Sequence, residues 1–278
     1  MLRLSRDRVL VGLAPEALTL LRVSGAARPR VSDLRTVACD PAFGSEPWQG
    51  AAAALARLAG EIGKASARVT VVLSNHFARF ALIPWSEGLG GAEEEAAFAR
   101  YCFAKIHGER SKDWDLRLSP APAGSTRIAS AVDTSLVQSL KAAFPAKAKL
   151  ASIQPYLMSA FNRVRGQIKG IKGAGAWFLL IEPQRACLVR MERGRWATVR
   201  SARGNFDGPQ EWAGLLDRER HLAGGEVSDA VYVHAPQSWK ARSAEAQGWA
   251  FRNLELARVE GPALPAESAA TAMALSAL

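Results

Sequence analysis

Cysteine is scarce in this sequence of 278 residues, and its spacing is uninformative. Only Cys39, Cys102 and Cys187 occur, an odd number at wide intervals, so we expect no disulfide framework and a reducing compartment. The three cysteines and four histidines show none of the HxxxH, HxH or CxxC spacings that are typical of zinc sites. We therefore predict no metal and no cofactor.

Long apolar runs are also missing. No stretch reaches the roughly 20 consecutive apolar residues that a membrane-spanning helix needs. The N-terminal segment has early arginines followed by apolar residues, as in a signal peptide, but Pro15 and Glu16 interrupt it and no cleavage pattern follows. We read this segment as two strands over 8–13 and 17–23 and expect a soluble, cytoplasmic protein.

Acidic residues are outnumbered, because 26 Asp and Glu stand against 36 Lys and Arg, giving a net charge of +10. This balance fits nucleic acid, an anionic membrane surface or an acidic protein as a partner. The densest basic run, 163–172, is interpreted as a solvated helix end and linker, and no nucleic-acid-binding signature accompanies it. We expect no nucleic-acid partner; a basic nucleic-acid-binding protein stays open as an alternative that rests on charge alone.

Apolar residues make up 49% of the chain, which excludes a disordered protein, and they follow strand and helix periodicities. The runs 69–74 and 77–83 are read as a buried strand and its hairpin partner. Further strands of the first half are expected over 31–38, 126–132 and 150–153. Helices are expected over 48–62 and from residues 93, 134 and 155 onward.

The pattern starts again after 166–175, a Gly- and Lys-rich stretch that reads as a hinge or linker. The strands predicted for this second half are 177–181, 186–191, 196–202, 229–234 and 249–256. A helix is expected over 212–222, and a final one over 266–278. The segments 13–23 and 181–191 can be laid over each other without a gap, with proline on proline and Arg22 on Arg190. The match indicates an internal duplication.

Two lobes that each open with a strand–turn–strand hairpin, then add a third strand and helices, resemble the duplicated actin-like ATPase (ribonuclease H-like) fold. More narrowly, the sequence is similar to the pilus-assembly protein PilM and its relatives, including the cytoplasmic domain of the type II secretion protein GspL. The segments that carry this resemblance are 69–85, 93–95, 128–133, 150–155 and 200–204. It implies an α/β fold of two lobes, with mixed sheets flanked by helices. The lobes are expected at 1–168, with an inserted subdomain, and at 169–278.

The chain departs from the nucleotide-binding members of this fold at their phosphate contacts. Those members carry an Asp-x-Gly turn in each opening hairpin, whereas here the turns are 12–15 and 181–183, with proline and without Asp. Proline has no N–H to donate to phosphate. The late Gly-Gly contact would fall at His234–Pro236. We expect a protein that is not an enzyme; an actin-fold ATP-binding protein or kinase with degenerate phosphate loops is retained as an alternative.

The resemblance implies a non-catalytic cytoplasmic scaffold of a type IV pilus or type II secretion-like assembly platform, peripheral to the inner membrane. Its implied partner is the cytoplasmic tail of a membrane-embedded assembly protein, and a secretion ATPase and the anionic membrane surface are further candidates. The pilus or secretion system and the oligomeric state stay open.

Three aromatic residues are the candidate partner contacts: Trp85, Phe80 and Tyr101. Trp85 follows Pro84 at a strand exit and precedes a polar, Gly-rich loop, so it has few local neighbours. Tryptophan is enriched among residues that dominate binding energy at interfaces, although a packing lid remains the alternative.

Overall fold

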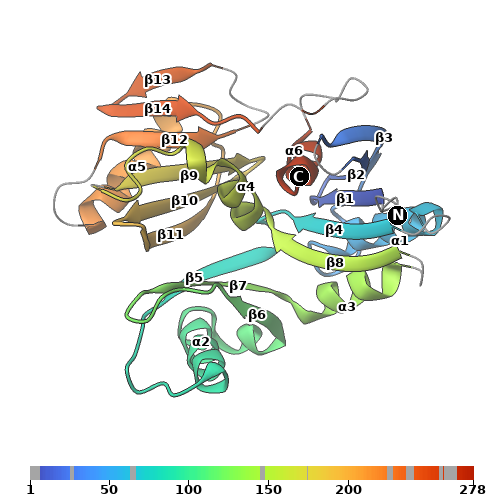
Figure 1. Cartoon of the computed structure of the whole chain (residues 1–278), viewed down its shortest axis with the longest axis horizontal. Coiled ribbons are helices and arrows are strands. Elements are labelled where there is room, and N and C mark those ends of the chain that lie inside the picture. The colour runs from blue at the N-terminus through green and yellow to red at the C-terminus, as the bar shows by residue number, and fades with distance from the viewer. Residues whose placement is uncertain are drawn as a thin grey trace, which may run out of the picture. The chain divides into compact units, whose positions relative to one another are not determined.

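The computed structural model describes residues 7–25, 28–62, 67–144, 148–173, 175–223, 228–235, 241–256, 259 and 268–278. The fold is α/β, with three sheets and flanking helices (Figure 1). Two compact units emerge from the contacts. Unit 1 comprises 1–77, 135–164 and 255–278, and unit 2 comprises 78–134 and 165–254.

Unit 1 contains a five-stranded mixed sheet in the order β3-β2-β1-β4-β8. Its strands are β1 (Asp7–Leu13), β2 (Ala17–Ser24), β3 (Arg30–Ala38), β4 (Ala67–Leu73) and β8 (Ala148–Pro155). The first three strands are antiparallel neighbours, and β1, β4 and β8 run parallel. β4 is rich in valine and buried along most of its length, as expected for a parallel strand covered on both faces.

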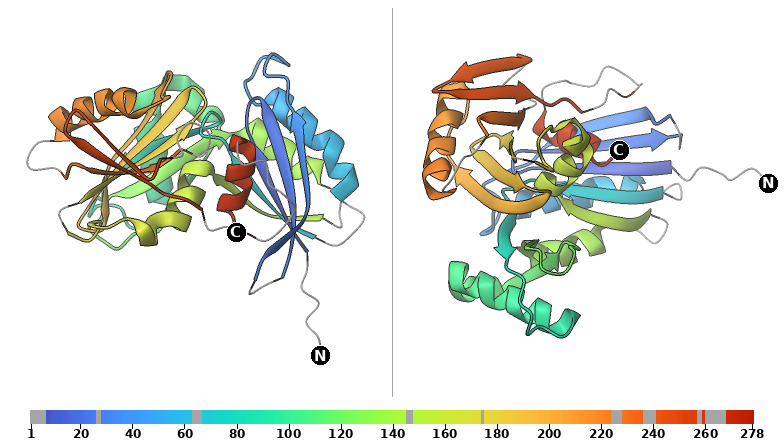
Figure 2. Two further views of the ribbon diagram at one scale, coloured as in Figure 1. Left: turned by 90° about the horizontal axis from the view of Figure 1, so that it is seen from above. Right: turned by 60° about the vertical axis from the view of Figure 1, so that its left-hand side comes forward.

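Helices cover both faces of this sheet: α1 (Gln49–Ile62) lies on one face and α6 (Ala269–Ser276) on the other, as the left view of Figure 2 shows. α3 (Thr134–Ala143) and α4 (Tyr156–Val164) complete the helices of this part of the chain. α6 is alanine-rich and almost wholly buried. It lies so close to β1 that a Cβ added at Gly12 would come 1.8 Å from the carbonyl oxygen of Ala270. Glycine is therefore required at position 12 by packing.

The larger sheet of unit 2 has six strands in the order β11-β10-β9-β12-β14-β13. They are β9 (Ala176–Glu182), β10 (Arg185–Glu192), β11 (Arg195–Arg203), β12 (Ala230–His234), β13 (Ser243–Ala246) and β14 (Trp249–Asn253). α5 (Pro209–Ala223) covers one face. Trp177, Trp212 and Trp249 are fully buried between this helix and the sheet, which makes this core strongly aromatic.

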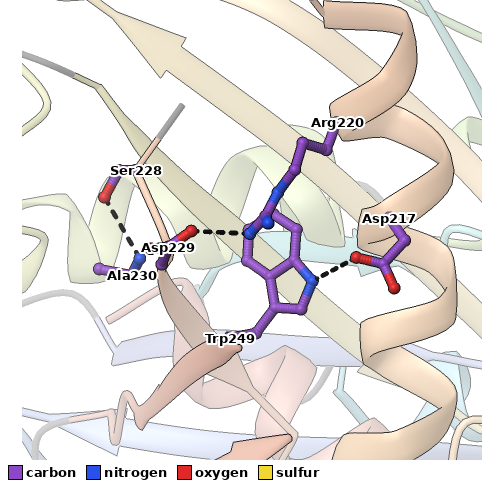
Figure 3. Close-up of polar contacts among 6 residues, drawn as sticks. All are labelled: Asp217, Arg220, Ser228, Asp229, Ala230 and Trp249. Carbon is purple, nitrogen blue, oxygen red and sulfur yellow. Dashed lines mark hydrogen bonds and ion pairs between the residues drawn. The ribbon is translucent and has the colours of Figure 1, made fainter. Parts of the chain in front are cut away.

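A polar cluster joins α5 to the strands beneath it (Figure 3). The guanidinium carbon of Arg220 lies 3.6 Å from the ring centroid of Trp249, and its Nη2 donates to Asp229 Oδ1 at 2.7 Å. The indole Nε1 of Trp249 donates to Asp217 Oδ1 at 2.8 Å. The buried indole thus has its polar atom satisfied and one ring face covered by a cation.

The smaller sheet of unit 2 has the strand order β5-β7-β6. β5 (Ala78–Ile83), β7 (Arg127–Asp133) and β6 (Trp114–Leu118) are antiparallel neighbours, and α2 (Ala92–His107) packs on one face. A short 3-10 turn, η1 (Gly108–Asp113), links α2 to β6. Phe103 is the fully buried centre of this core, and β5 also contacts β11 of the larger sheet.

β5 is not the hairpin partner of β4, so that prediction was wrong. Both edges of β4 are occupied, by β1 and by β8, and β5 pairs with β7 instead. The turn between the two strands is fixed by a hydrogen bond from Phe77 N to Ser74 O at 2.9 Å and by Asn75, whose Oδ1 accepts from Leu157 N at 3.0 Å. The chain is thereby directed out of the first sheet.

The compact units differ from the expected division at residue 168 in two respects. The inserted sheet with β5, β6 and β7 groups with the second half of the chain, and α6 packs on the first sheet. The stretch interpreted as a linker forms an ordered turn: Gly194 N donates to Ile171 O at 2.7 Å, which ties it to the β10–β11 hairpin. Residue 174 lies outside the described residues.

Candidate partner-binding site

Trp85 projects from the end of β5 and is 45% exposed. β5 ends at Ile83, and Pro84, which has no N–H to offer a neighbouring strand, follows it directly. A turn then brings Leu89 N to Ser86 O at 3.4 Å. Because tryptophan is normally well buried, an indole exposed to this extent is not a core residue.

A small pocket of about 20 Å³ opens beside Trp85, enough for a water or a methyl-sized group. Its lining comes from the exit of β5, the following loop, the first turn of α2 and the ends of β6 and β7. The lining residues are Ile83, Pro84, Trp85, Ser86, Leu89, Glu95, Leu118 and Arg127. Most of them are apolar, and the two charged members face each other as a pair.

This pair forms the polar side of the pocket. Arg127 Nη1 lies 2.7 Å from Glu95 Oε2, and the two side chains are 25% and 30% exposed. The neighbouring Glu94 accepts a hydrogen bond from Gly90 N at 2.6 Å, which fastens the loop to the helix. Carboxylates at this helix start are favoured by the partial positive charge of the N-terminus. The site therefore has an apolar floor and a fixed charged rim.

The other two predicted contacts lie elsewhere. Ala81 and Ile83 belong to the core beneath α2, so Phe80 points to the opposite face of the small sheet. Tyr101 is 55% exposed on α2, where it stacks on Phe98 at 6.4 Å between ring centroids. Neither residue lines the pocket, so only Trp85 of the three predicted residues contributes to it.

Sequence reasoning missed Leu89, Leu118 and Arg127 as pocket residues. Three carboxylates at 93–95 are favoured by the helix N-terminus alone, and that preference does not predict the ion pair of Glu95. Arg127 is 32 positions away in the chain from Glu95. Only the antiparallel register, with Ile83 opposite Arg127, brings the two segments together.

The two hairpin turns that would hold phosphate in a nucleotide-binding relative are engaged locally. Ala14 N donates to Ala17 O at 2.9 Å, and Pro15 has no N–H. In the second turn Pro183 again lacks the donor, and Gln184, at φ 56°, accepts from Gly204 N at 3.2 Å. Neither turn presents a row of free backbone N–H groups for an anion.

The strand end where a Gly-Gly contact was sought carries the buried His234. Its Nδ1 lies 3.0 Å from Leu254 O, and burial lowers its pKa, so the ring is held neutral as a structural group. Pro236 lies outside the described residues. In the described ranges no group of three or more His, Cys, Asp or Glu is arranged to hold a metal ion. No helix within the described part of the chain is long and apolar enough to cross a membrane.

Neither a protein-family model nor a curated protein matches the sequence. Solved structures do. The chain is similar to one in the PilM-PilN type IV pilus biogenesis complex, at 15% identity and TM-score 0.56, over 81% of this chain and 80% of that one. It is similar to a Bacteroides thetaiotaomicron protein of unknown function with an actin-like ATPase fold, at 16% identity and TM-score 0.57, over 84% and 83%.

A third similar structure is the cytoplasmic domain of EpsL, an inner-membrane component of the type II secretion system of Vibrio cholerae. The identity is 12% and the TM-score 0.56, over 97% of this chain and 93% of that one. These matches span most of each chain, and they confirm the predicted fold: an α/β protein with the actin-like ATPase architecture and mixed sheets flanked by helices.

Proposed function

We propose that this protein is a non-catalytic scaffold of a type IV pilus or type II secretion-like assembly platform. It binds the cytoplasmic tail of an inner-membrane assembly protein and sits at the cytoplasmic face of that membrane. The fold supports this proposal, because two similar structures belong to such machines, one of them in complex with a partner.

The observation that carries the binding role is the exposed Trp85 beside its apolar pocket. When a partner covers an exposed tryptophan, nearly all of its remaining apolar surface is removed from water, which favours binding. The pocket next to the indole accepts a small apolar group, and the Arg127–Glu95 pair offers hydrogen bonds at the rim. An apolar anchor within a polar rim is the usual anatomy of a protein interface.

The non-catalytic part of the proposal rests on the hairpin turns. Phosphoryl transfer depends on donors that position and neutralise the phosphates, and both turns replace a donor by proline. The excess of basic residues suits a position beside anionic lipid head groups. A secretion ATPase is a further proposed partner.

The test uses a synthetic peptide covering the cytoplasmic tail of the proposed inner-membrane assembly protein. Trp85→Ala should weaken peptide binding about thirtyfold, the effect of truncating a true anchor. The melting temperature of the free protein should change little, because nearly half of the removed side chain is already exposed. Isothermal titration calorimetry and a thermal melt measure the two quantities.

Phe43→Ala is the matched control, since Phe43 is another exposed aromatic side chain, at 54%, and lies in unit 1. It should leave the affinity for the peptide unchanged. Tyr101→Ala separates a single anchor from a broad aromatic surface and should weaken binding much less than Trp85→Ala. If Trp85→Ala unfolds unit 2 or leaves the affinity intact, the binding role assigned to this pocket is wrong.

A further inference from the structure

Four strands of the first sheet start at the same end of that sheet, and each starts with a basic residue. β3, β1, β4 and β8 run in one direction, and only β2, between β3 and β1, runs the other way. Each of the four has an arginine or lysine among its first two residues, and Arg28 precedes β3. We call these five residues the basic end: Arg8, Arg28, Arg30, Arg68 and Lys149.

The strand pairing places three of these cations in one row. Arg8 is in register with Arg68, and Arg68 is in register with Lys149. Neighbouring strands lie roughly 5 Å apart, so the three charges repel one another. Arg8 is half-buried and its Nη2 donates to Gly25 O at 3.5 Å, whereas Arg68 and Lys149 are exposed. The sheet itself gains nothing from this row, which points to a use outside the sheet.

The acidic groups near the basic end are fewer than its cations. Asp7 begins β1, and Asp33, further along β3, is already paired with Arg35 at 3.4 Å. Leu278, the last residue of the sequence, packs against the same sheet, so its carboxylate is counted too. No member of the basic end forms an ion pair with another described residue. Five cations against the carboxylates of Asp7 and Leu278 leave an excess of three positive charges.

The segments that lead into these strands are basic in sequence as well. Segments 1–8, 24–30, 61–68 and 141–149 each end on the first or second residue of one of the four strands. Together they contain ten Lys and Arg but only two acidic residues, Asp7 and Glu61. This excess of eight is most of the net charge of +10 of the whole chain. The charge is therefore concentrated in the segments that lead into one end of one sheet.

We propose that the basic end is the surface through which this protein lies on an anionic lipid bilayer. The cations extend over the width of five strands, roughly 20 Å, which suits a layer of many head groups rather than one small anion. Each Lys or Arg close to such a layer adds to the attraction. Proteins that hold single-stranded nucleic acid add aromatic side chains on which bases stack, and none of the described residues at these strand starts is aromatic. The proposal deepens the scaffold role and rests on it for the presence of a membrane.

The experiment measures co-sedimentation of the full chain with lipid vesicles, without any peptide. Vesicles of phosphatidylcholine alone are compared with vesicles of phosphatidylcholine and phosphatidylglycerol in equal amounts, at low and moderate salt. Wild-type protein should bind only the anionic vesicles, and less well at moderate salt. Arg68→Gln and Lys149→Gln should each weaken binding about fivefold, and the double substitution more than about tenfold. Neither substitution should lower the melting temperature, because both side chains are exposed and each removal relieves repulsion.

Arg57→Gln is the matched control, since Arg57 is exposed on α1 of the same unit and its loss removes the same charge. Arg57 lies towards the other end of β3: burial raises the pKa of Cys39, which follows that strand, and the charge of Arg57 lowers it. The control should leave vesicle binding unchanged. Equal weakening by Arg57→Gln would mean unspecific attraction to a basic protein and would overturn the proposal.

Other outcomes would overturn it too. They are equal binding to both kinds of vesicle, no binding to anionic vesicles at low salt, and tighter binding to random duplex DNA than to anionic vesicles, which would assign the basic end to nucleic acid. A protein that binds the tail peptide but no vesicle would refute the membrane surface and leave the scaffold role intact. Vesicle binding that depends on Arg68 and Lys149 supports the membrane surface even where the peptide fails to bind.

Discussion

The five-stranded sheet of unit 1 and the six-stranded sheet of unit 2 have the same plan. Each has three antiparallel strands, β3-β2-β1 or β11-β10-β9, followed by parallel strands, β4 and β8 or β12 and β14. The opening hairpins even agree in register, since Leu13 stands opposite Leu18 and Ile181 opposite Ala186. These are equivalent positions in the gapless overlay of 13–23 on 181–191.

The two sheets differ in what fills the equivalent positions. Gly12 opposite Thr19 in β1–β2 corresponds to Leu180 opposite Cys187 in β9–β10. In the first sheet the space is taken by the backbone of α6, and in the second by a buried leucine side chain. The two sheets therefore share their strand pairing, whereas the side chains at equivalent positions differ according to what packs against them.

The largest effect is expected where the first sheet is made more like the second. Gly12→Ala places a Cβ 1.8 Å from the carbonyl oxygen of Ala270, a backbone atom that moves only if α6 moves. We expect a loss of about 3 kcal/mol or more in the free energy of unfolding, measured by urea denaturation. Gly60→Ala on α1 meets nothing within 4 Å and should be neutral or slightly stabilising. Equal effects of the two substitutions would contradict the close packing of α6.

The next effect concerns the polar cluster of Figure 3, which attaches α5 to the second sheet. Arg220→Met keeps most of the side-chain volume but removes the cation over Trp249 and the ion pair with Asp229. We expect about 2 kcal/mol of lost stability, because the ring contact is close and partly desolvated. Arg218→Met, on the exposed side of the same helix, is the control and should change stability little. A loss that vanished in high salt would assign the effect to the surface ion pair alone.

A smaller effect is expected in the pH dependence of stability, because Cys187 carries a titratable thiol where the equivalent position of the first sheet holds Thr19. Burial raises the pKa of the Cys187 thiol from 9.0 to about 12. Between these values the unfolded chain loses its proton while the folded chain keeps it, so stability falls as the pH rises above about 9. Cys187→Thr should remove about 1 kcal/mol of this loss at pH 10, relative to the difference at pH 7. Urea denaturation at both pH values checks it; parallel slopes for variant and wild type would refute the buried, neutral thiol.

For magnesium we expect no effect on the melting temperature at all. Magnesium should add nothing to any shift that ATP alone causes in a thermal melt, because neither hairpin turn offers a metal-organising Asp or a free N–H cradle. A nucleotide bound with its metal at 100 times its dissociation constant would add about 2.7 kcal/mol. A magnesium-dependent shift of that size would show that one of the two hairpins had kept the function that both are inferred to have lost.

Most strands and helices could be predicted from the sequence because each follows from a local pattern of apolar residues. Strands predicted over 8–13, 17–23 and 31–38 appear at Asp7–Leu13, Ala17–Ser24 and Arg30–Ala38. β13 was not foreseen, since Ser243–Ala246 is short and half-exposed at a sheet edge and carries little apolar signal. The pairing of β5 was predicted wrongly because strands adjacent in sequence usually form a hairpin. The edge of β4 that β5 would have used is occupied by β8, whose residues 148–155 come much later in the chain.

The candidate site was accessible only in part. Trp85 stood out because proline and glycine on either side deprive it of local neighbours. Its partners Leu118 and Arg127 reach it through the antiparallel pairing of β5, β7 and β6, which no short-range pattern encodes. Phe80 and Tyr101 are also aromatic, but strand alternation and helix geometry turn them to other surfaces.

The order of segments in the chain has a consequence for biosynthesis. Thr19 of β2 and Thr271 of α6 are hydrogen-bonded at 3.2 Å although 252 positions separate them. During translation the first sheet leaves the ribosome with the face around Gly12 uncovered, and the residues of unit 2 are made before α6 can close it. Such long-range closure is slow and leaves apolar surface open to aggregation. A chain arrested before residue 268 should therefore depend on chaperones, whereas a chain that includes residues 268–278 should have a first sheet that resists proteolysis.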